Sequence, residues 1–329
     1  MLAVEVVLQV LLATFGFMGT LINIIVLYAL FKVKIGSRST NILMRSQCAF
    51  DALAGFFTFL YKIIGPEIIT GLVNLDLFLC IIWYGDSLIW IWVSCSVCNI
   101  VCMSMDHAIA VFCPLFYRIH QTLLIGFSLI YVVALSIILF LSNLFDRAFF
   151  NGHCQRVQVF NNKALEMFMN AENFLWLIFI YLVPFIIISS THAAVILYIM
   201  QKWKLHKLKS NTKVSRNEEQ LWKMYKRTRE IALTTVCMAS TLLLCHAYDA
   251  ITYSLDASGL FDYVLLSVPQ QAGLLPIILS TSILPCISAG RIKSLREYIL
   301  INMIQGFLSE LGLDKALAQP TMDSQAELR

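Results

Sequence analysis

Charged residues are scarce in this chain of 329 residues, because Asp, Glu, Lys and Arg make up only 13% of it. A soluble domain carries about 25% charged residues, so a soluble globule of this length is excluded. The hydrophobic share of 59% excludes a disordered chain, and the small net charge of +4 disfavours a nucleic-acid binder. These absences leave an integral membrane protein.

The scarcity of charged residues is explained by long stretches of the chain that contain none. Seven windows approach or exceed the roughly 20 residues that a helix needs to cross a bilayer, and none alternates like a β-barrel strand. We therefore expect an all-α membrane protein, with a bundle of seven transmembrane helices in residues 1–302. The expected spans are 6–33, 40–64, 79–112, 121–145, 173–201, 224–254 and 263–290, followed by a short amphipathic helix at 291–302 and a cytoplasmic tail at 303–329.

Basic residues gather on one side of these spans. All but four of the 24 fall in the loops and tail on the side of the first loop, and the exceptions are Lys62, Arg147, Arg156 and Lys163. Because Lys and Arg concentrate in cytoplasmic loops, we expect a multi-pass plasma-membrane protein with its N-terminus outside and its C-terminus inside. The first span lacks the basic n-region of a signal peptide, so we expect it to be retained.

The most specific motif lies at the end of the third span. Residues 104–117 read S-M-D-H-A-I-A-V-F-C-P-L-F-Y, which resembles the S-x-D-R-Y-x-A-V-x-x-P-L-x-Y of the rhodopsin-like (class A) G protein-coupled receptors. The resemblance covers about residues 6–302, and further motif positions match at Asn23, Asp51, Cys80, Trp83, Ser96, Asn99, Cys154 and Pro184. It implies a cell-surface receptor, not an enzyme, that binds an extracellular ligand and signals through heterotrimeric G proteins.

Several switch positions of the family hold other residues here, so we expect a divergent member. The interval from Cys80 to His107 is two residues longer than usual, which leaves the alignment near Asp86 open. The replaced positions are His107 for the arginine of D-R-Y, His192 for the fifth-helix tyrosine, His246 for the sixth-helix tryptophan, and Leu284 and Ser288 in the seventh-helix N-P-x-x-Y.

Two of the ten cysteines fall on the side expected outside, Cys80 at the outer end of the third span and Cys154 in the long outside loop. That compartment is oxidising, so we expect a disulfide bond between them. The other eight lie in or near spans, and we interpret Cys95, Cys98 and Cys102, which share one helix face, as small packing residues.

An aspartate in the middle of the second span is the first candidate binding site. An ionised side chain at the bilayer centre costs at least about 2.5–3.5 kcal/mol, so its presence suggests a function. The resemblance implies an allosteric sodium ion, held by Asp51, Ser96, Ser280 and Thr281, and we expect no other cofactor. The alternative is a neutral, hydrogen-bonded aspartic acid.

Polar and aromatic residues near the outer ends of the spans are the candidate ligand site: Asp86, Trp90, Trp176, His246, Asp249, Tyr253 and Gln271. Two carboxylates near aromatic rings favour a cationic ligand. Ser87 and Ile89 hold the places where amine receptors of the family carry aspartate, so a peptide with a basic group is favoured over a simple amine. Alternatively, Asp86 faces outside water.

The resemblance places G-protein coupling at Asp106, His107, Pro114, Lys226, Arg227 and Arg229. Arginine offers five donors in a fixed fork, whereas histidine is shorter and titrates near pH 6.5. We hypothesise that coupling is reduced here and rises when His107 is protonated. Alternatively, His107 snorkels to the membrane surface or caps its helix.

Rival functions stay open to different degrees. An intramembrane aspartyl protease is disfavoured because the motifs ending at Asp86 and Asp249 come in reversed order, and a retinal pigment because residues 263–290 lack lysine. The missing internal repeat weakens a transporter or channel without excluding it. A receptor fold that binds ligand without G-protein coupling also remains an alternative.

Overall fold

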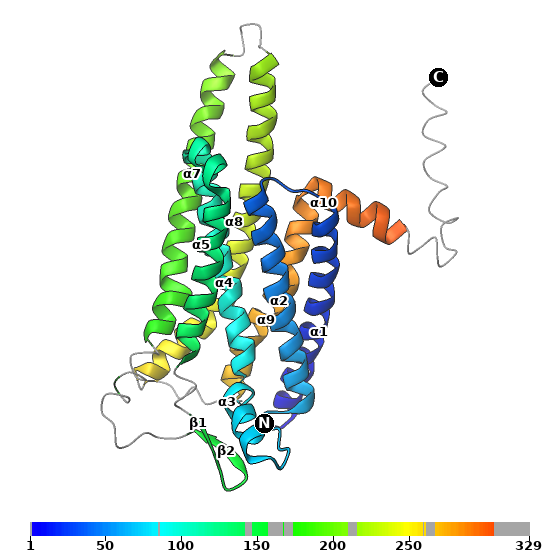
Figure 1. Cartoon of the computed structure of the whole chain (residues 1–329), viewed down its shortest axis with the longest axis vertical. Helices are drawn as coiled ribbons and strands as arrows, with labels where there is room; N and C mark the ends of the chain where they lie inside the picture. The colour runs from blue at the N-terminus through cyan, green and yellow to red at the C-terminus, as the bar shows by residue number, and fades with distance from the viewer. Residues whose placement is uncertain are drawn as a thin grey trace.

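The computed structural model describes residues 2–84, 86–141, 147–156, 167, 174–209, 216–258, 260 and 267–305. Within these residues, seven apolar helical segments are long enough to span a membrane, and they pack as one bundle (Figure 1). The predicted all-α, seven-helix fold is therefore confirmed. The main helices are α1 (Leu2–Lys32), α2 (Arg38–Ile64), α3 (Val73–Ile82), α4 (Ser87–Phe112), α5 (Pro114–Phe140), α7 (Val183–Lys209), α8 (Arg216–Ala257) and α9 (Val268–Arg291).

The third span is broken, although the sequence predicted one uninterrupted segment at 79–112. It consists of α3 and α4, which are separated at the level of Trp83 to Asp86. Asp86 has a φ of +55°, in the left-handed region that aspartate enters more readily than most residues. This break lies between Cys80 and His107, where the chain has two residues more than the family pattern.

Two other spans depart from regular helix near a proline. The fourth was predicted to begin at residue 121, but α5 begins at Pro114, a residue suited to the first turn, and deviates at His120 (φ −106°, ψ 18°). The fifth begins with a π-helical segment, Leu177–Leu182, just before Pro184, which cannot donate a backbone hydrogen bond.

The remaining helix ends also differ from the predicted ones. α8 extends beyond the predicted 224–254 at both ends, and Ser267 caps α9 by accepting a hydrogen bond from the backbone of Gln270. The short helix expected at 291–302 is present as α10 (Lys293–Tyr298) and a π-helical segment, Ile299–Gln305. Its tail, from residue 306 onward, lies outside the described residues.

α4 is the central helix of the bundle. It contacts α2, α5, α7 and α8, and its side chains form much of the main apolar core. Cys95, Cys98 and Cys102 lie buried in that core, which agrees with a packing role. α4 runs from the end of the bundle that the sequence predicts to be outside the cell (the outer end) to the end that it predicts to be inside (the inner end). It therefore connects the two groups of polar residues described next.

A β-hairpin that the sequence analysis missed lies beside the outer end of α3. Its strands, β1 (Arg147–Phe150) and β2 (His153–Arg156), are antiparallel and pair Phe150 with His153. The turn is Asn151-Gly152, both with positive φ, and Asn-Gly is the strongest short-range hairpin signal. That dipeptide was the signal that could have revealed the hairpin.

Candidate functional site

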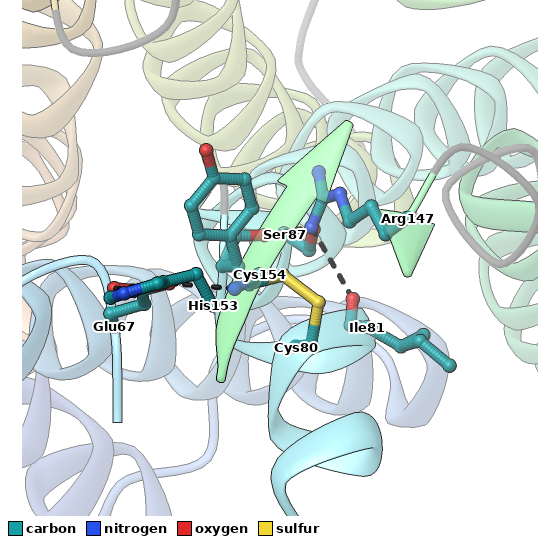
Figure 2. Close-up of a disulfide and its surroundings, with 8 residues drawn as sticks. Glu67, Cys80, Ile81, Ser87, Arg147, His153 and Cys154 are labelled. Carbon is teal, nitrogen blue, oxygen red and sulfur yellow. Dashed lines mark hydrogen bonds and ion pairs between the residues drawn. A yellow bond between two sulfur atoms is a disulfide. The ribbon is translucent and has the colours of Figure 1, made fainter. Parts of the chain in front are cut away.

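The outer end of the third span is covalently tied to the hairpin. A disulfide joins Cys80, in the last turn of α3, to Cys154 of β2, as predicted (Figure 2). The carboxylate of Glu67 accepts the backbone N–H of Cys154 at 2.7 Å and lies 3.4 Å from Nδ1 of His153. The hairpin is therefore held by the disulfide and by Glu67, which contacts both its backbone and a side chain.

Arg147 of β1 covers the C-terminal end of α3. Its guanidinium donates to the carbonyl oxygen of Ile81 at 3.3 Å, to that of Tyr84, and to the hydroxyl of Ser87 (Figure 2). Carbonyls at the end of a helix lack intrahelical donors and carry partial negative charge, so a cation is favourable there. The break between α3 and α4 is thus stabilised from outside the helix.

Asp86 lies buried at this break, with only 2% of its surface exposed. Trp90 Nε1 donates to one carboxylate oxygen at 3.1 Å, and Gln270 Nε2 of α9 donates to the other at 2.9 Å. The cationic groups of Lys62 and Arg147 interact with it electrostatically. Asp86 therefore does not face outside water, and it links α4 to α9.

The other predicted ligand residues are only partly brought together. The rings of Trp90 and Trp176 pack edge to face beside Asp86, with their centroids 5.5 Å apart. Asp249 lies against α9, since a β-carbon at Gly273 would be 3.5 Å from its Oδ1. Buried positions are also held by His246 and Gln271, while Tyr253 is half-buried. The contact to Asp86 comes from Gln270, which the sequence analysis had not selected.

Asp51 lies at the centre of a buried polar network in the middle of the bundle. Ser96 Oγ donates to Asp51 Oδ1 at 2.6 Å, and the side-chain amide of Gln47 donates to Asp51 Oδ2 at 3.0 Å and to Ser96 Oγ at 2.6 Å. Asn99 in turn donates to Gln47 Oε1 at 2.9 Å. The contacts agree with the hydrogen-bonded part of the alternative, a neutral, hydrogen-bonded aspartic acid, while its neutrality stays a prediction.

As arranged, these residues do not fit the sodium ion expected from the sequence. A cation that bridged Asp51 and Ser96 would have to displace the Gln47 amide, whose two N–H groups already bridge them. The hydroxyls of the two seventh-helix candidates, Ser280 and Thr281, donate to carbonyls of their own helix at 2.6 and 2.7 Å. Sodium binding stays a prediction for a conformation in which Gln47 has turned away.

The inner end of α4 holds a second buried group around Asp106. Its Oδ2 accepts hydrogen bonds from the hydroxyls of Tyr117 of α5 at 3.0 Å and Thr40 of α2 at 3.1 Å. The Tyr117 hydroxyl also pairs with Ser37, the residue that caps α2. The Asp106 carboxylate thus joins α4 to α5 and α2, and of its two partners only Tyr117 belongs to the motif read from the sequence.

His107 points into the bundle and contacts α8. It is 6% exposed, and its Nε2 lies 2.8 Å from the hydroxyl of Thr235. The same hydroxyl lies 3.2 Å from the carbonyl oxygen of Ile231 in its own helix. His107 therefore neither snorkels nor caps its helix. Another histidine, His192 of α7, makes the equivalent contact to Ser104 at 3.2 Å.

The remaining coupling residues lie near the same end of the bundle. Pro114 begins α5, and only Cys113 separates it from α4. Arg229 is exposed on α8. Lys226 and Arg227 belong to α8 as well, but their side chains lie outside the described part of the structure. A role in coupling stays a prediction for all of them.

Comparisons with known proteins agree with this geometry. The crystal structure of squid rhodopsin superposes with a TM-score of 0.71 over 96% of this chain and 92% of that one, at 15% identity, which shows a shared fold. No curated protein matched the chain. A sequence model of the family described as "Serpentine type 7TM GPCR chemoreceptor Srx" matches residues 14–269. The chain therefore belongs to the Srx family of serpentine seven-transmembrane chemoreceptors, which are G protein-coupled receptors.

Proposed function

We propose that this receptor signals by separating α8 from the inner end of α4 when a ligand binds at the outer end. The observation that carries the proposal is the hydrogen bond between His107 and Thr235, which joins the two helices at the D-R-Y position. The family and fold are those of receptors rather than enzymes, with an external ligand and a heterotrimeric G protein as partners.

The proposed mechanism is a shift between two helix arrangements. α4 reaches both Asp86 at its outer end and the Asp106–His107 pair at its inner end, so a ligand that prefers one position of α4 changes both. A ligand can shift this equilibrium only by its difference in affinity for the two arrangements. The inner contacts are hydrogen bonds of ordinary strength, which a modest difference suffices to open.

The ligand proposed is an extracellular peptide with a basic group. Two carboxylates, Asp86 and Asp249, are buried in the outer half of the bundle, and the rings of Trp90 and Trp176 meet beside the first. Aromatic faces and carboxylates together attract a cationic group. In this proposal the basic group replaces one of the internal partners of Asp86, such as the Gln270 amide.

The proposed location is the plasma membrane, with the hairpin end outside and the α10 end inside. The asymmetry of the basic residues and the disulfide at the hairpin support this orientation. Impermeant labelling of a tag at each terminus of intact cells tests it, because only an N-terminal tag is then reached before permeabilisation.

The test of signalling is recruitment of purified G proteins to the receptor while a panel of basic peptides and small amines is applied. His107→Ala is expected to raise basal recruitment, because the contact between α4 and α8 is lost. A rise in wild-type recruitment from about pH 8 to about pH 6 that is absent in His107→Ala would support the hypothesis that a protonated His107 aids coupling. Asp106 and His192 are the titratable groups that interact with His107, so Asp106→Asn and His192→Gln serve as comparison variants in the pH series.

A receptor fold without coupling is the second candidate, favoured by the missing arginine at His107. Equal recruitment at both pH values and no response to His107→Ala, together with ligand binding, would support it. Ion current or uptake in cells that express this chain alone would instead indicate a transporter or channel.

A further inference from the structure

An apolar groove lies on the lateral surface of the bundle, which would face the lipid, where α9 is flanked by α1 and α8. Its cavity volume is about 530 Å³, within the range of roughly 300–1,000 Å³ that small-molecule sites occupy. α1 contributes Ile22 and α8 contributes Cys237 to its lining, and α9 contributes Ser282, Ile283, Cys286, Ile287, Gly290 and Arg291. The groove is therefore separate from the polar groups described above.

The lining residues of α9 explain why the surface is hollow. They recur three or four positions apart, so they form one stripe along the helix. The stripe ends at Gly290, where an added β-carbon would meet nothing within 4 Å. The half-buried side chains of Ile22, Ile283 and Ile287 form apolar walls around this open space.

Two guanidinium groups lie at one end of the groove. Arg291 is part of its lining and is exposed, and Arg296 of α10 donates from Nη1 to the carbonyl oxygen of Gly290 at 3.2 Å. Lys293 of α10 is 3.7 Å from Glu297 and is thus partly neutralised. Figure 1 shows that α10 leaves the bundle at the end opposite the hairpin. The groove therefore combines an apolar length with positive charge at that end.

We propose that this groove binds one acyl chain of an anionic phospholipid, whose phosphate group lies against Arg291 and Arg296. In the proposed orientation the basic end faces the cytoplasm, and the cytoplasmic leaflet is the one that carries anionic lipids. Charge complementarity selects this occupant, because a sterol carries no anion for two guanidinium groups to bind. The acyl chain would lie along Ile283 and Ile287, where helix packing leaves the space open.

The experiment is native mass spectrometry of the purified full-length receptor, released from detergent micelles that contain phosphatidylserine and phosphatidylcholine with identical chains. The wild type is expected to retain one phosphatidylserine. Arg291→Gln should lower the preference for phosphatidylserine about fivefold, the effect of one basic residue near an anionic lipid surface. Gly290→Leu should reduce retention of both lipids, because its side chain fills the groove.

Matched controls lie on α5. Gly126 also has nothing within 4 Å of an added β-carbon, and Arg118 is also exposed, so Gly126→Leu and Arg118→Gln repeat each change elsewhere. Both controls should retain phosphatidylserine like the wild type, and thermal unfolding shows whether each variant is folded.

Some outcomes would overturn the proposal. Two of them concern the variants: full lipid retention in folded Gly290→Leu, and an unchanged lipid preference in Arg291→Gln. The others are displacement of the phospholipid by added sterol at equal concentration, and a receptor dimer that dissociates in Gly290→Leu. The readout needs neither a ligand nor a G protein, so its failure would leave the proposed signalling function untouched.

Discussion

The two ends of α4 are held in different ways. At the outer end a disulfide and the Arg147 guanidinium fix the break before the helix, while at the inner end Asp106 and His107 are held by hydroxyl groups of other helices. A disulfide is covalent and contributes about 2–4 kcal/mol, whereas a single hydrogen bond contributes about 0.5–1.5 kcal/mol, or about 1.5–3 kcal/mol where it meets a charged group. The difference indicates a fixed outer frame and an inner end that can rearrange.

Removing the covalent link should give the largest effect. Cys154→Ser is expected to lower the free energy of unfolding by about 2–5 kcal/mol, since the link that closes the chain between α3 and β2 is lost. Thermal unfolding and surface expression measure this. Cys286→Ser is the control, because that cysteine is free and exposed. An unchanged unfolding temperature in Cys154→Ser would remove the contrast between the two ends.

Opening the Asp106 network should have the next largest effect, and it should appear in signalling. Asp106→Ala removes the carboxylate that accepts from the hydroxyls of Tyr117 and Thr40, which keep Ser37 as a partner, at about 0.5–1.5 kcal/mol for each hydrogen bond lost. We expect raised basal G-protein recruitment together with lowered thermal stability. Tyr117→Phe removes one donor only and should change both quantities less. Lower basal recruitment in Asp106→Ala would contradict a restraining role.

A smaller effect is expected from the single contact between α4 and α8. Thr235→Val keeps the shape of the side chain but removes the hydrogen-bond partner of His107, at about 0.5–1.5 kcal/mol, so basal recruitment should rise by at most about tenfold. Thr234→Val is the matched control, because the neighbouring hydroxyl bonds the carbonyl of Glu230 in its own helix. Equal responses in the two variants would mean that the His107 contact does not restrain α8.

The smallest effect concerns the middle of α4, between the two ends. Gln47→Leu removes the amide that bridges Asp51 and Ser96, and thereby opens the position that a cation would take. The variant should gain about 0.4 kcal/mol of stability at a sodium concentration equal to its dissociation constant, and the wild type less. Unfolding in sodium chloride against choline chloride tests this. Equal sodium effects in both proteins would show that Gln47 does not block the ion.

Much of this architecture could be predicted from local sequence. The seven spans follow from hydropathy, the motif at 104–117 marks the end of α4, and the Cys80–Cys154 disulfide follows from the two cysteines on the side expected outside. These features depend on residue type and spacing along the chain. The helix ends were predicted less well, because hydropathy does not register Pro114 as a helix start or the break before Asp86.

The partners of the candidate site residues could not be predicted in the same way. Asp86 accepts from Gln270 of α9, a residue 184 positions away in the chain, and the neighbouring Gln271 is equally buried. The Gln47 amide, the Thr235 hydroxyl and the Arg147 guanidinium reach their partners across gaps between helices or strands. The hydrophobic periodicity of one helix shows which of its own faces is buried. It does not show which residues of a neighbouring helix face it.

The sequence by itself determined that this chain is a seven-helix membrane protein, because crossing a bilayer demands long apolar segments whatever they pack against. Only the tertiary structure decided that the two ends of α4 differ in strength, and that Asp51 is bridged to Ser96 by an amide. The physical reason is range: apolar length and charge asymmetry act within single segments, whereas a buried hydrogen bond needs two groups from different helices within about 3 Å.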